Sequence, residues 1–440
     1  MVDLFCGCGG LTYGLQSTGR FQTVLSVDSS EDALRTLVHN HSVNGRCPKI
    51  IAADLGSFGA AAIRSELRRL GILTGELDCL VGGPPCEGFS QNHGKAIAGR
   101  DAHDFLASDT YATRQWYRAR GASATRVKRT RRSQLHDARN HLFRIMLDAA
   151  ELTKPKIVVI ENVREFLTYK DGEIKDEICI FLEAIGYRVE VAVLNAADYG
   201  VPQLRKRAFI VALRSDIAAT FSGSAFPKRT HKERQNGSAD RDGVYVTVRE
   251  ALMGLPVATL HDGNVKPDVP RRITAPTPFQ RYIAGGSGTV YPSQHVTRPI
   301  SLKVLNRIKA MKPGMKIRDL PAKLRPRKFY ANAYARLQWG KPANTITKSF
   351  NNLGSGKFCH PSRDRGITVR EAARLQSFPD TFEFVGSVRA ITAMIGGAVP
   401  PLLARALGLH FADILDCATK PRKRSARQDN NRAHNGRRGG

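Results

Sequence analysis

Short apolar runs alternate with helix-like segments through the first half of the chain. The apolar runs lie at residues 2–5, 23–27, 49–54, 77–81, 156–162, 188–195 and 206–213. Segments near 11–18, 30–41 and 57–70 instead place apolar residues at the spacing of an amphipathic helix. Continuous apolar runs of roughly four to eight residues indicate strands that are buried on both faces. Their alternation with helices predicts an α/β fold built on a doubly wound, mostly parallel sheet.

This rhythm is lost after about residue 213. Residues 214–335 are rich in Pro, Gly and Arg, with few long periodic segments, and they predict a second, smaller and irregular domain. One helix is expected there from Ser301 to Met311, with a stripe of apolar side chains and a Pro-Gly stop after it. The stripe consists of Leu302, Leu305, Ile308 and Met311.

Helical patterning returns towards the C-terminus, at 368–377 and 388–407. Two segments, Thr247 to Glu250 and Thr368 to Glu371, share the sequence Thr-Val-Arg-Glu. In a capping box, a Thr side chain and a Glu three residues later each bond the other's backbone N–H. Both segments are therefore expected to open helices.

The charge of the chain is strongly positive and unevenly distributed. Its 68 Lys and Arg residues against 39 Asp and Glu residues give a net charge of +29, with an isoelectric point near 10.2. Residues 110–132 hold eight basic residues and no acid, and residues 420–440 hold eight basic residues and one acid. Such an excess favours a polyanionic partner, and nucleic acid is the first candidate. Residues 411–440 are expected to form a basic, disordered tail.

Eight cysteines in 440 residues are too few and too scattered for a disulfide framework. Cys6 and Cys8 are the only close pair, and no two cysteines have Cys-x-x-Cys spacing. The pattern indicates free thiols in a reducing cytoplasm and no structural metal. No apolar run approaches the roughly 20 residues that span a bilayer, and the N-terminus lacks a signal-peptide pattern, so no membrane association is expected.

One cysteine stands in a distinctive segment, GGPPCEGFS at residues 82–90. Free cysteines are most often small buried hydrophobes, so Cys86 could be a core thiol, a metal ligand or a nucleophile. Gly82-Gly83 ends the apolar run before it, and Pro84-Pro85 cannot continue a central strand. Cys86 is therefore expected on a stiff loop at the carboxyl end of a strand, which is where open α/β sheets bind ligands.

A glycine-rich turn follows the first predicted strand. In DLFCGCGG, Gly7, Gly9 and Gly10 allow the backbone to approach a ligand closely, although the spacing is not GxGxxG because Thr stands at position 12. Asp28 ends the second strand, where a carboxylate can accept from both ribose hydroxyls. Asp54 ends the third strand, where it can meet an adenine amino group. These features indicate an adenosine-containing cofactor without deciding between a dinucleotide and S-adenosylmethionine.

Six segments together resemble the DNA (cytosine-5) methyltransferases. They are DLFCGCGGLTYGL, GGPPCEGFS, IENV, YGVPQLRKRAFIVAL, RLQWGKPANTIT and the stretch from HPSRDRGITVREAARLQSFPDTF to IGGAVPP. PPC, ENV and QxRxR occur in this order at the ends of successive predicted strands, and the resemblance extends from about residue 2 to 410. It implies a Rossmann-like, S-adenosylmethionine-dependent methyltransferase fold. The implied divisions are a catalytic domain at 1–213, a target-recognition domain at 214–335 and motifs that return to the catalytic domain at 336–410.

The resemblance also implies roles for individual residues. Cys86 is matched to the nucleophile whose thiolate adds to C6 of cytosine, so that C5 can attack the methyl group of S-adenosylmethionine. Glu161, in ENV, is matched to the acid that contacts N3 and N4 of the base. Arg205 and Arg207, in QLRKR, are matched to arginines that bind O2 and the adjoining backbone, and Gln203 is expected to orient this segment. The expected cofactor-binding residues are Phe5, Gly7, Gly9, Asp28, Ser29, Asp54 and Pro84, and no metal ligand is expected.

The partners follow from the same resemblance. Cytosine in a duplex hides its C6 face, so the target base is expected to be flipped out of double-stranded DNA. The segment from Cys86 to about His141 corresponds to the family's active-site loop, with residues 98–132 as a basic insertion. A cognate restriction endonuclease could be a functional partner, and the enzyme is expected to be a monomer associated with the nucleoid in the cytoplasm. The sequence does not reveal which DNA sequence is methylated.

Three features depart from the family pattern. Glu87 follows the nucleophile where the family usually has Gln, and an acid there should raise the pKa of the Cys86 thiol. Gly397 stands where the family has Asn in GNAVPP, which removes one supporting contact near the cofactor or the active-site loop. The chain also begins almost inside the first strand, so the true start could lie upstream. Two alternatives stay open, a transfer-RNA cytosine-5 methyltransferase with the same motifs and a catalytically silent DNA-binding homologue.

Overall fold

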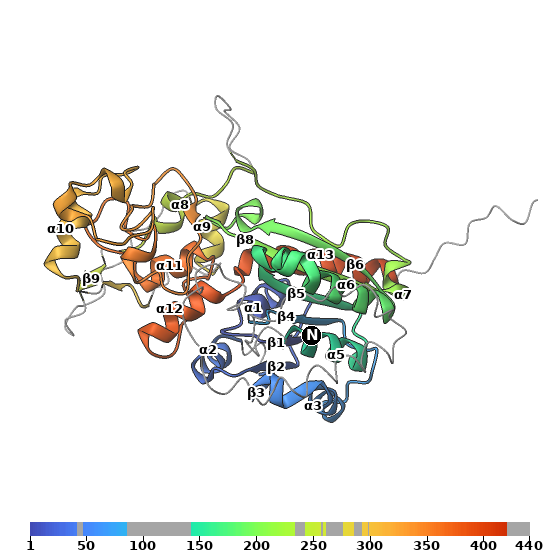
Figure 1. Cartoon of the computed structure of the whole chain (residues 1–440). Coiled ribbons are helices and arrows are strands. Elements are labelled where there is room, and N and C mark those ends of the chain that lie inside the picture. Colours follow the sequence, from blue (N-terminus) through green and yellow to red (C-terminus); the bar gives the residue numbers. More distant parts are fainter. Residues whose placement is uncertain are drawn as a thin grey trace, which may run out of the picture.

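The computed structural model describes residues 1–41, 47–85, 142–233, 243–256, 258–260, 276–285, 293–297 and 299–419. Figure 1 shows two lobes, a larger one built on a sheet and a smaller one that holds the orange segments of the chain. Among the described residues, seven strands form the large sheet in the order β3-β2-β1-β4-β5-β8-β6. They are β1 (Val2–Leu4), β2 (Leu25–Asp28), β3 (Lys49–Ala52), β4 (Cys79–Gly82), β5 (Ile157–Val163), β6 (Tyr187–Asn195) and β8 (Lys206–Arg214).

The prediction of a doubly wound, mostly parallel sheet is confirmed. β1 to β5 pair in parallel, and β8 is antiparallel to both of its neighbours, β5 and β6. Alternate strand residues face opposite sides. On β5, Val158 and Ile160 join one hydrophobic core, whereas Ile157 and Val159 join the core on the other face. The strands read as continuous apolar runs because both faces are covered.

Helices cover the two faces of the sheet in separate layers. The core on one face is completed by α3 (Leu55–Arg69), α5 (Phe143–Thr153) and α6 (Glu173–Ala184). The core on the other face is completed by α1 (Gly10–Gln16), α7 (Ser215–Ala218) and α13 (Pro401–Thr419). The remaining helix near the sheet, α2 (Glu31–His41), packs through Leu34 and Leu37.

The smaller lobe is built mainly from short elements. Its helices are α8 (Val248–Leu252), α9 (Pro278–Ile283), α10 (Leu302–Ala310), α11 (Val369–Leu375) and α12 (Val388–Gly397), and its two-residue strands are β9 (Thr259–Leu260) and β10 (Val296–Thr297). A further parallel pair joins β7 (Gln203–Leu204) to β11 (Ala343–Asn344). The predicted capping boxes at Thr247 and Thr368 are both present.

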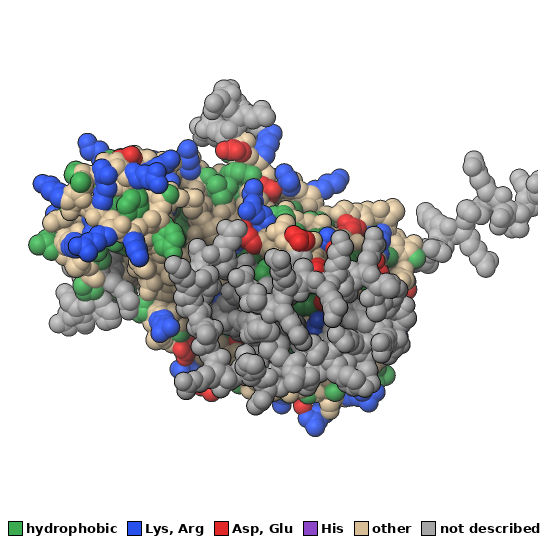
Figure 2. Space-filling view, viewed as in Figure 1, with side chains coloured by type: hydrophobic (Ala, Val, Ile, Leu, Met, Phe, Trp, Pro, Cys, Tyr) green, Lys and Arg blue, Asp and Glu red, His purple; other side chains and the backbone are tan. Residues whose placement is uncertain are grey.

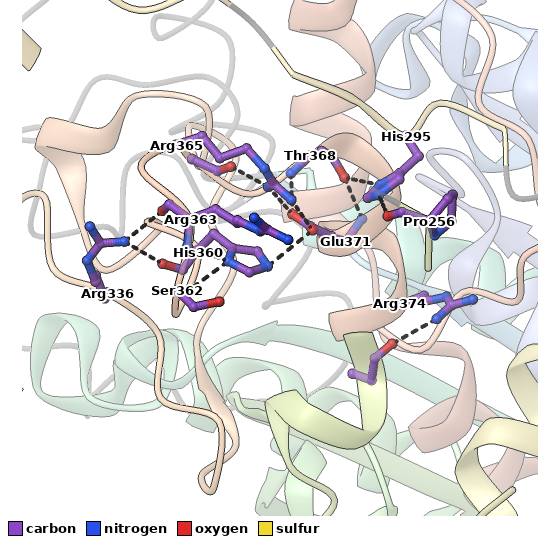
Figure 3. A network of polar contacts seen from close by, with 12 residues as sticks. Pro256, His295, Arg336, His360, Ser362, Arg363, Arg365, Thr368, Glu371 and Arg374 are labelled. Atoms are coloured by element: carbon purple, nitrogen blue, oxygen red, sulfur yellow. Dashed lines mark hydrogen bonds and ion pairs between the residues drawn. The ribbon is translucent and has the colours of Figure 1, made fainter. Parts of the chain in front are cut away.

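Buried polar groups hold the irregular segments of the smaller lobe together (Figure 3). Glu371, in the capping box of α11, receives two hydrogen bonds from Arg365 at 2.7 Å. Nδ1 of His360 accepts from the backbone N–H groups of Ser362 and Arg363, so this ring nitrogen carries no proton. Burial lowers the pKa of His360 to about 4, which keeps the ring neutral at ordinary pH. The network therefore fixes the 360–371 segment without a regular sheet.

The expected domain boundaries need correction. The core of the small lobe contains Phe279 and Ile308 together with Ile346 and Phe378, so it continues across the expected boundary at 335/336. At the other end, residues 214–226 belong to the large lobe, where Ile217 and Ala225 are buried against the sheet. Burial of apolar side chains decides both limits, and the loss of sequence periodicity does not mark either of them.

Three predictions about the helices and the tail were wrong in detail. The expected helix at 388–407 is two helices, because Pro400 and Pro401 end the first and open the second. The expected tail begins too early, because α13 continues to Thr419 with Phe411 and Ile414 buried on the sheet. On α10, Leu302 is 71% exposed and does not belong to the buried stripe.

No single helix of the described ranges is long and apolar enough to cross a membrane. The helices α12 and α13 reach the necessary length and apolar composition only when they are taken together, and they are bent by 41° relative to each other.

Candidate active site

The predicted ligand-binding residues gather at the carboxyl edge of the sheet. β1 pairs with β2 on one side and with β4 on the other, so the chain reverses its direction of winding at β1. Loops that leave such a switch point diverge and form a crevice. Phe5 and Gly7 follow β1, Asp28 ends β2, and Pro84 follows β4.

The turn after β1 has the backbone of a close-approach loop. Phe5, Gly7 and Gly9 have φ values of 58°, 53° and 82°, in the left-handed region that favours glycine. A Cβ built on Gly7 would meet no atom within 4 Å, whereas one built on Gly10 would lie 2.5 Å from the carbonyl oxygen of Val399. Gly10 thus serves helix packing, while Gly7 leaves open space where a ligand can approach the backbone.

Asp28 is held in place by backbone donors. The N–H of Gly7 donates to its Oδ2 and the N–H of Ser30 donates to its Oδ1, both at 2.8 Å. These bonds tie the turn after β1 to the turn after β2, and Ser29 is exposed beside them. A carboxylate oxygen can accept more than one hydrogen bond, so Asp28 can also receive ligand hydroxyls.

Asp54 has a structural role in addition to the cofactor contact expected from the sequence. It is the N-cap of α3, and its Oδ1 accepts from the backbone N–H groups of Gly56 and Ser57 at 2.7 and 3.3 Å. The residue is exposed at the end of β3. The capping bonds use one oxygen and fix the direction of the other. The two carboxylates, Asp28 and Asp54, and the open space at Gly7 fit an adenosine-containing ligand.

Sequence reasoning missed Asp3, which lies inside β1. Its side chain is 1% exposed and accepts a hydrogen bond from the hydroxyl of Thr12 on α1. Burial raises the pKa of Asp3 to about 7, and the negative charge of Asp28 adds to this effect. The pair explains why Thr stands at position 12, where a GxGxxG turn would have Gly. An acid in an otherwise apolar run was the available signal.

Glu161 and Arg207 form the charged centre of the site. In the antiparallel register of β5 and β8, Glu161 faces Phe209 and Val163 faces Arg207, so Glu161 and Arg207 are diagonal neighbours. The Nε of Arg207 lies 3.3 Å from Oε1 of Glu161, and only 15% and 11% of the two side chains are exposed. Burial raises the pKa of the Glu161 carboxyl, and the charges of Arg207, Arg205 and Lys348 offset part of that increase.

The carboxylate of Glu161 also lies against the GGPPC segment. A Cβ built on Gly83 would be 3.2 Å from its Oε2. The next residue on β5, Asn162, donates from Nδ2 to the carbonyl oxygen of Pro84 at 3.2 Å and accepts from the backbone N–H of Val163. Asn162 was missed as a site residue, although it belongs to the ENV motif. It ties the loop after β4 to the strand that carries Glu161.

Arg205 differs from Arg207 in its surroundings. Its residue is 1% exposed, and its guanidinium donates to three backbone carbonyls, those of Ile346, Gly396 and Ala398, each at 3.0 Å. The expectation that Arg205 binds the target nucleotide therefore needs correction for this conformation. The guanidinium is committed to holding two segments of the small lobe together.

Gln203 orients its segment, as expected. Its Nε2 donates to the carbonyl oxygen of Leu375 and to Oε1 of Gln376, and its Oε1 accepts from the N–H of Ile346 at 2.8 Å. The side chain is fully buried. Gln203 and Arg205 together therefore connect β7 to the end of α11 and to the segment after β11 by hydrogen bonds.

Cys86 and Glu87 lie outside the described residues, as do residues 98–132. Cys6 and Cys8 are buried free thiols, and burial raises the pKa of Cys8 to about 12, so this thiol stays neutral. Within the described ranges, no group of three or more His, Cys, Asp or Glu side chains is arranged to hold a metal ion.

The mostly parallel sheet with one reversed strand is a Rossmann-like methyltransferase fold, and the candidate ligand site lies at its switch point. A family model described as C-5 cytosine-specific DNA methylase matches residues 1–107 and 128–411. The chain belongs to this family and is a DNA (cytosine-5) methyltransferase. The unmatched residues 108–127 fall inside the segment expected to be an insertion.

Individual relatives agree with the family. The chain is 29% identical over 409 residues to the type II methyltransferase M1.HphI of Haemophilus parahaemolyticus, an alignment that covers 92% of this chain and 84% of that protein. It is 28% identical over 428 residues to M.DdeI of Desulfomicrobium norvegicum, with 92% and 87% covered. A crystal structure from E. coli, described as a DNA modification methyltransferase encoded within a prophage, superposes with a TM-score of 0.64 at 20% identity and covers 94% of this chain and 99% of that one. The last likeness supports the fold.

Proposed function

We propose that this enzyme methylates C5 of a flipped-out cytosine within a specific double-stranded DNA sequence, through a covalent bond from Cys86 to C6 of the base. The observation that carries the proposal is the buried Glu161–Arg207 pair beside Gly83. The acid of this pair lies against Gly83, which precedes Cys86 by three residues, at the edge of the sheet where ligands bind.

The proposed methyl transfer proceeds in three steps, which are addition of the thiolate, transfer of the methyl group and release of the base. The Cys86 thiolate adds to C6, which makes C5 electron-rich enough to form a bond to a methyl carbon. Bound S-adenosylmethionine supplies that methyl group on a sulfonium sulfur. A base then removes the C5 proton, the electrons of that bond restore the C5–C6 double bond, and the sulfur leaves C6 as thiolate. Cytosine thereby becomes 5-methylcytosine and the enzyme is regenerated.

Glu161 is suited to share a proton with N3 of the base. As sulfur adds, negative charge develops on the ring and N3 becomes more basic. A carboxyl whose pKa is raised by burial carries its proton to higher pH than an exposed one, which suits it to donate a proton to N3. Arg207, beside it, is placed to bind the O2 oxygen of the base. Arg205 would affect Glu161 and Arg207 indirectly, through the backbone segments to which its guanidinium is hydrogen-bonded.

The cofactor contacts follow from the crevice. Phe5, Gly7 and Gly9 would lie where the backbone comes closest to the cofactor, and Pro84 would lie on the opposite side of the crevice. Asp28 with Ser29 would accept or donate at the ribose hydroxyls, and Asp54 would receive the adenine amino group. The left-handed turn and the open space at Gly7 support this placement.

A basic surface on the small lobe supports binding to DNA. Residues 301–330 contain ten Lys and Arg residues and one acid, Asp319. Nine of the basic residues are exposed, namely Lys303, Lys309, Lys312, Lys316, Arg318, Lys323, Arg325, Arg327 and Lys328. Figure 2 shows blue side chains gathered over this lobe. Clustered cations neutralise phosphates, so this surface would bind the duplex beside the target base.

The wider setting belongs to the proposal as well. A cognate restriction endonuclease would recognise the same DNA sequence, as the type II class of the relatives suggests. The enzyme would act as a monomer on chromosomal DNA in the cytoplasm.

Bisulfite sequencing of DNA from methylation-deficient cells that express the protein tests the proposal. We expect one short sequence to resist conversion at a single cytosine, and the same sequence to convert fully when Cys86→Ser is expressed. Full conversion of all DNA, together with methylation of transfer RNA from the same cells, would overturn the choice of DNA as substrate.

A further inference from the structure

Two exposed aromatic side chains lie within the basic surface of the small lobe. Phe329 is 37% exposed and Tyr330 is 58% exposed, and they are the only exposed Phe, Tyr or Trp residues in the described part of the chain. They belong to the loop at residues 326–332, here called the aromatic loop. Large aromatic side chains are normally buried when the fold alone decides their place, so their exposure here points to a ligand.

Neither ring has a partner among the described side chains. Tyr334, four residues after Tyr330, is different, because the guanidinium of Arg307 lies 5.3 Å from the centre of its ring and donates to its hydroxyl. No hydrogen bond or ring contact of this kind joins Phe329 or the side chain of Tyr330 to another described residue. Both rings are therefore free to meet a ligand.

The cations around the aromatic loop are not neutralised by acids. Residues 323–330, KLRPRKFY, include four Lys or Arg residues and no acid. No described Asp or Glu forms an ion pair with Arg327 or Lys328. The nearest acid in the sequence, Asp319, accepts from the backbone N–H of Lys316 instead. Figure 2 shows hydrophobic side chains among the Lys and Arg side chains of this lobe, a combination that suits nucleic acid, with its phosphates and apolar base surfaces.

Buried groups hold the aromatic loop at both ends. Before the loop, Nε of Arg325 donates to the carbonyl oxygen of Leu320 at 2.6 Å. After the loop, Ala333 is fully buried in a small core that also contains Leu320 and Met311. The guanidinium of Arg336 then donates from Nε to the carbonyl oxygen of Met311 at 2.7 Å. The two rings are thus presented on a fixed base, which precise recognition requires.

The same stretch of chain continues to the scaffold of the active site. After Arg336 it reaches β11, where Ala343 pairs with Gln203 of β7. The carbonyl oxygen of Ile346, just beyond β11, accepts from Arg205 at 3.0 Å. One continuous segment therefore carries the aromatic loop and the backbone that is bonded to the QLRKR motif.

We propose that Phe329 and Tyr330 are specificity-determining residues, which contact base edges of the bound duplex while the cations beside them bind its phosphates. A ring gains nothing from a charged phosphate, but it loses water when it packs against an apolar base edge such as a thymine methyl group. The hydroxyl of Tyr330 can also donate to a base or accept from one. The inference rests on the proposed function, because it takes double-stranded DNA as the ligand.

Duplex binding at several salt concentrations tests the proposal. Fluorescence anisotropy would compare the methylated sequence with a duplex that differs from it by one base pair outside the target cytosine. S-adenosylhomocysteine would be present so that no methyl group is transferred. Tyr330→Ala and Phe329→Ala should each weaken binding of the methylated sequence on the order of tenfold. Both variants should leave the affinity for the altered duplex and the salt dependence unchanged.

Two matched variants serve as controls. Lys328→Ala should weaken both duplexes alike and lower the slope of log affinity against log salt concentration by about one, because it removes a phosphate contact. Ile180→Ala removes a 55% exposed apolar side chain from α6 on the large lobe, and it should change neither affinity.

Equal losses for both duplexes in Tyr330→Ala and Phe329→Ala would overturn the proposal, because the rings would then contact DNA without reading it. Unchanged binding of both duplexes would also overturn it, and is the result expected if the rings serve a protein partner. Methylation by the wild-type enzyme separates the two failures. If the wild type methylates its sequence while both variants bind like wild type, only this inference fails. If the wild type methylates no duplex, the proposed function fails and this inference fails with it.

Discussion

The Nε of Arg207 and Oε1 of Glu161 lie 3.3 Å apart across two antiparallel strands, with little of either side chain exposed. Arg205, two residues earlier, is bonded instead to three backbone carbonyls. The two arginines of one motif thus have separate tasks. One faces the acid of the site, and the other holds the scaffold that positions it.

This division predicts opposite outcomes for two matched substitutions. Arg205→Lys cannot maintain three planar hydrogen bonds, so it should lower the free energy of unfolding by about 3 kcal/mol or more. Arg207→Lys keeps a positive charge beside Glu161, so it should lower stability by less than Arg205→Lys does, but it should slow methyl transfer on the order of a hundredfold. Urea unfolding and single-turnover rates measure the two effects. Equal losses of stability would show that the arginines share one structural role.

Glu161→Gln should alter how stability depends on pH. The pKa of Glu161 is raised by burial, with partial offset from the three cations. The folded state therefore binds more protons than the unfolded state, and stability falls as pH rises from the ordinary carboxyl value of 4.5 towards the raised value. Gln resembles the protonated form, so the variant should lose this dependence and gain stability relative to wild type across that window. Thermal unfolding at several pH values checks this, and parallel curves for the two proteins would contradict it.

Asp28→Ala should weaken binding of S-adenosylmethionine by about 1.5–3 kcal/mol, because it removes a charged hydrogen-bond acceptor. It also frees the N–H groups of Gly7 and Ser30, which loosens the turn. Asp28→Asn, which keeps one acceptor oxygen, should have a smaller effect. Calorimetry with the cofactor alone measures both, and unchanged affinity in Asp28→Ala would place the ribose contact elsewhere.

Asn162→Ala should loosen the loop that leads to Cys86. The substitution removes the bond to Pro84 and the acceptor for Val163, so it should cost about 1–3 kcal/mol of stability and slow the chemical step. Asn162→Asp keeps the acceptor and removes the donor, which isolates the contact with Pro84. If both variants retain the wild-type rate, the loop does not depend on this bond.

Much of the sheet could be predicted from sequence because burial on both faces leaves an unmistakable pattern. All seven apolar runs became strands, and the acids at the ends of β2 and β3 lie where the pattern places them. The limits of the small lobe could not be predicted in the same way. Its core joins Phe279 to Phe378 across about a hundred residues, and short irregular elements carry no period that would reveal such a contact.

The finer features of the site depend on contacts between distant residues. The role of Arg205 follows from carbonyls at 346, 396 and 398, and neither the sequence motif nor the spacing contains that information. Local motifs therefore identified the residue types, while packing decided what each one does.

Trapping the covalent adduct tests the central claim most directly. A duplex carrying 5-fluorocytosine at the methylated position would be incubated with the enzyme and S-adenosylmethionine. Fluorine replaces the proton that must leave C5, so the Cys86 bond to C6 cannot be released. We predict a protein–DNA complex that survives denaturation, requires the cofactor and is absent with Cys86→Ser. A wild-type enzyme that methylates the normal duplex but forms no such complex would contradict the covalent mechanism.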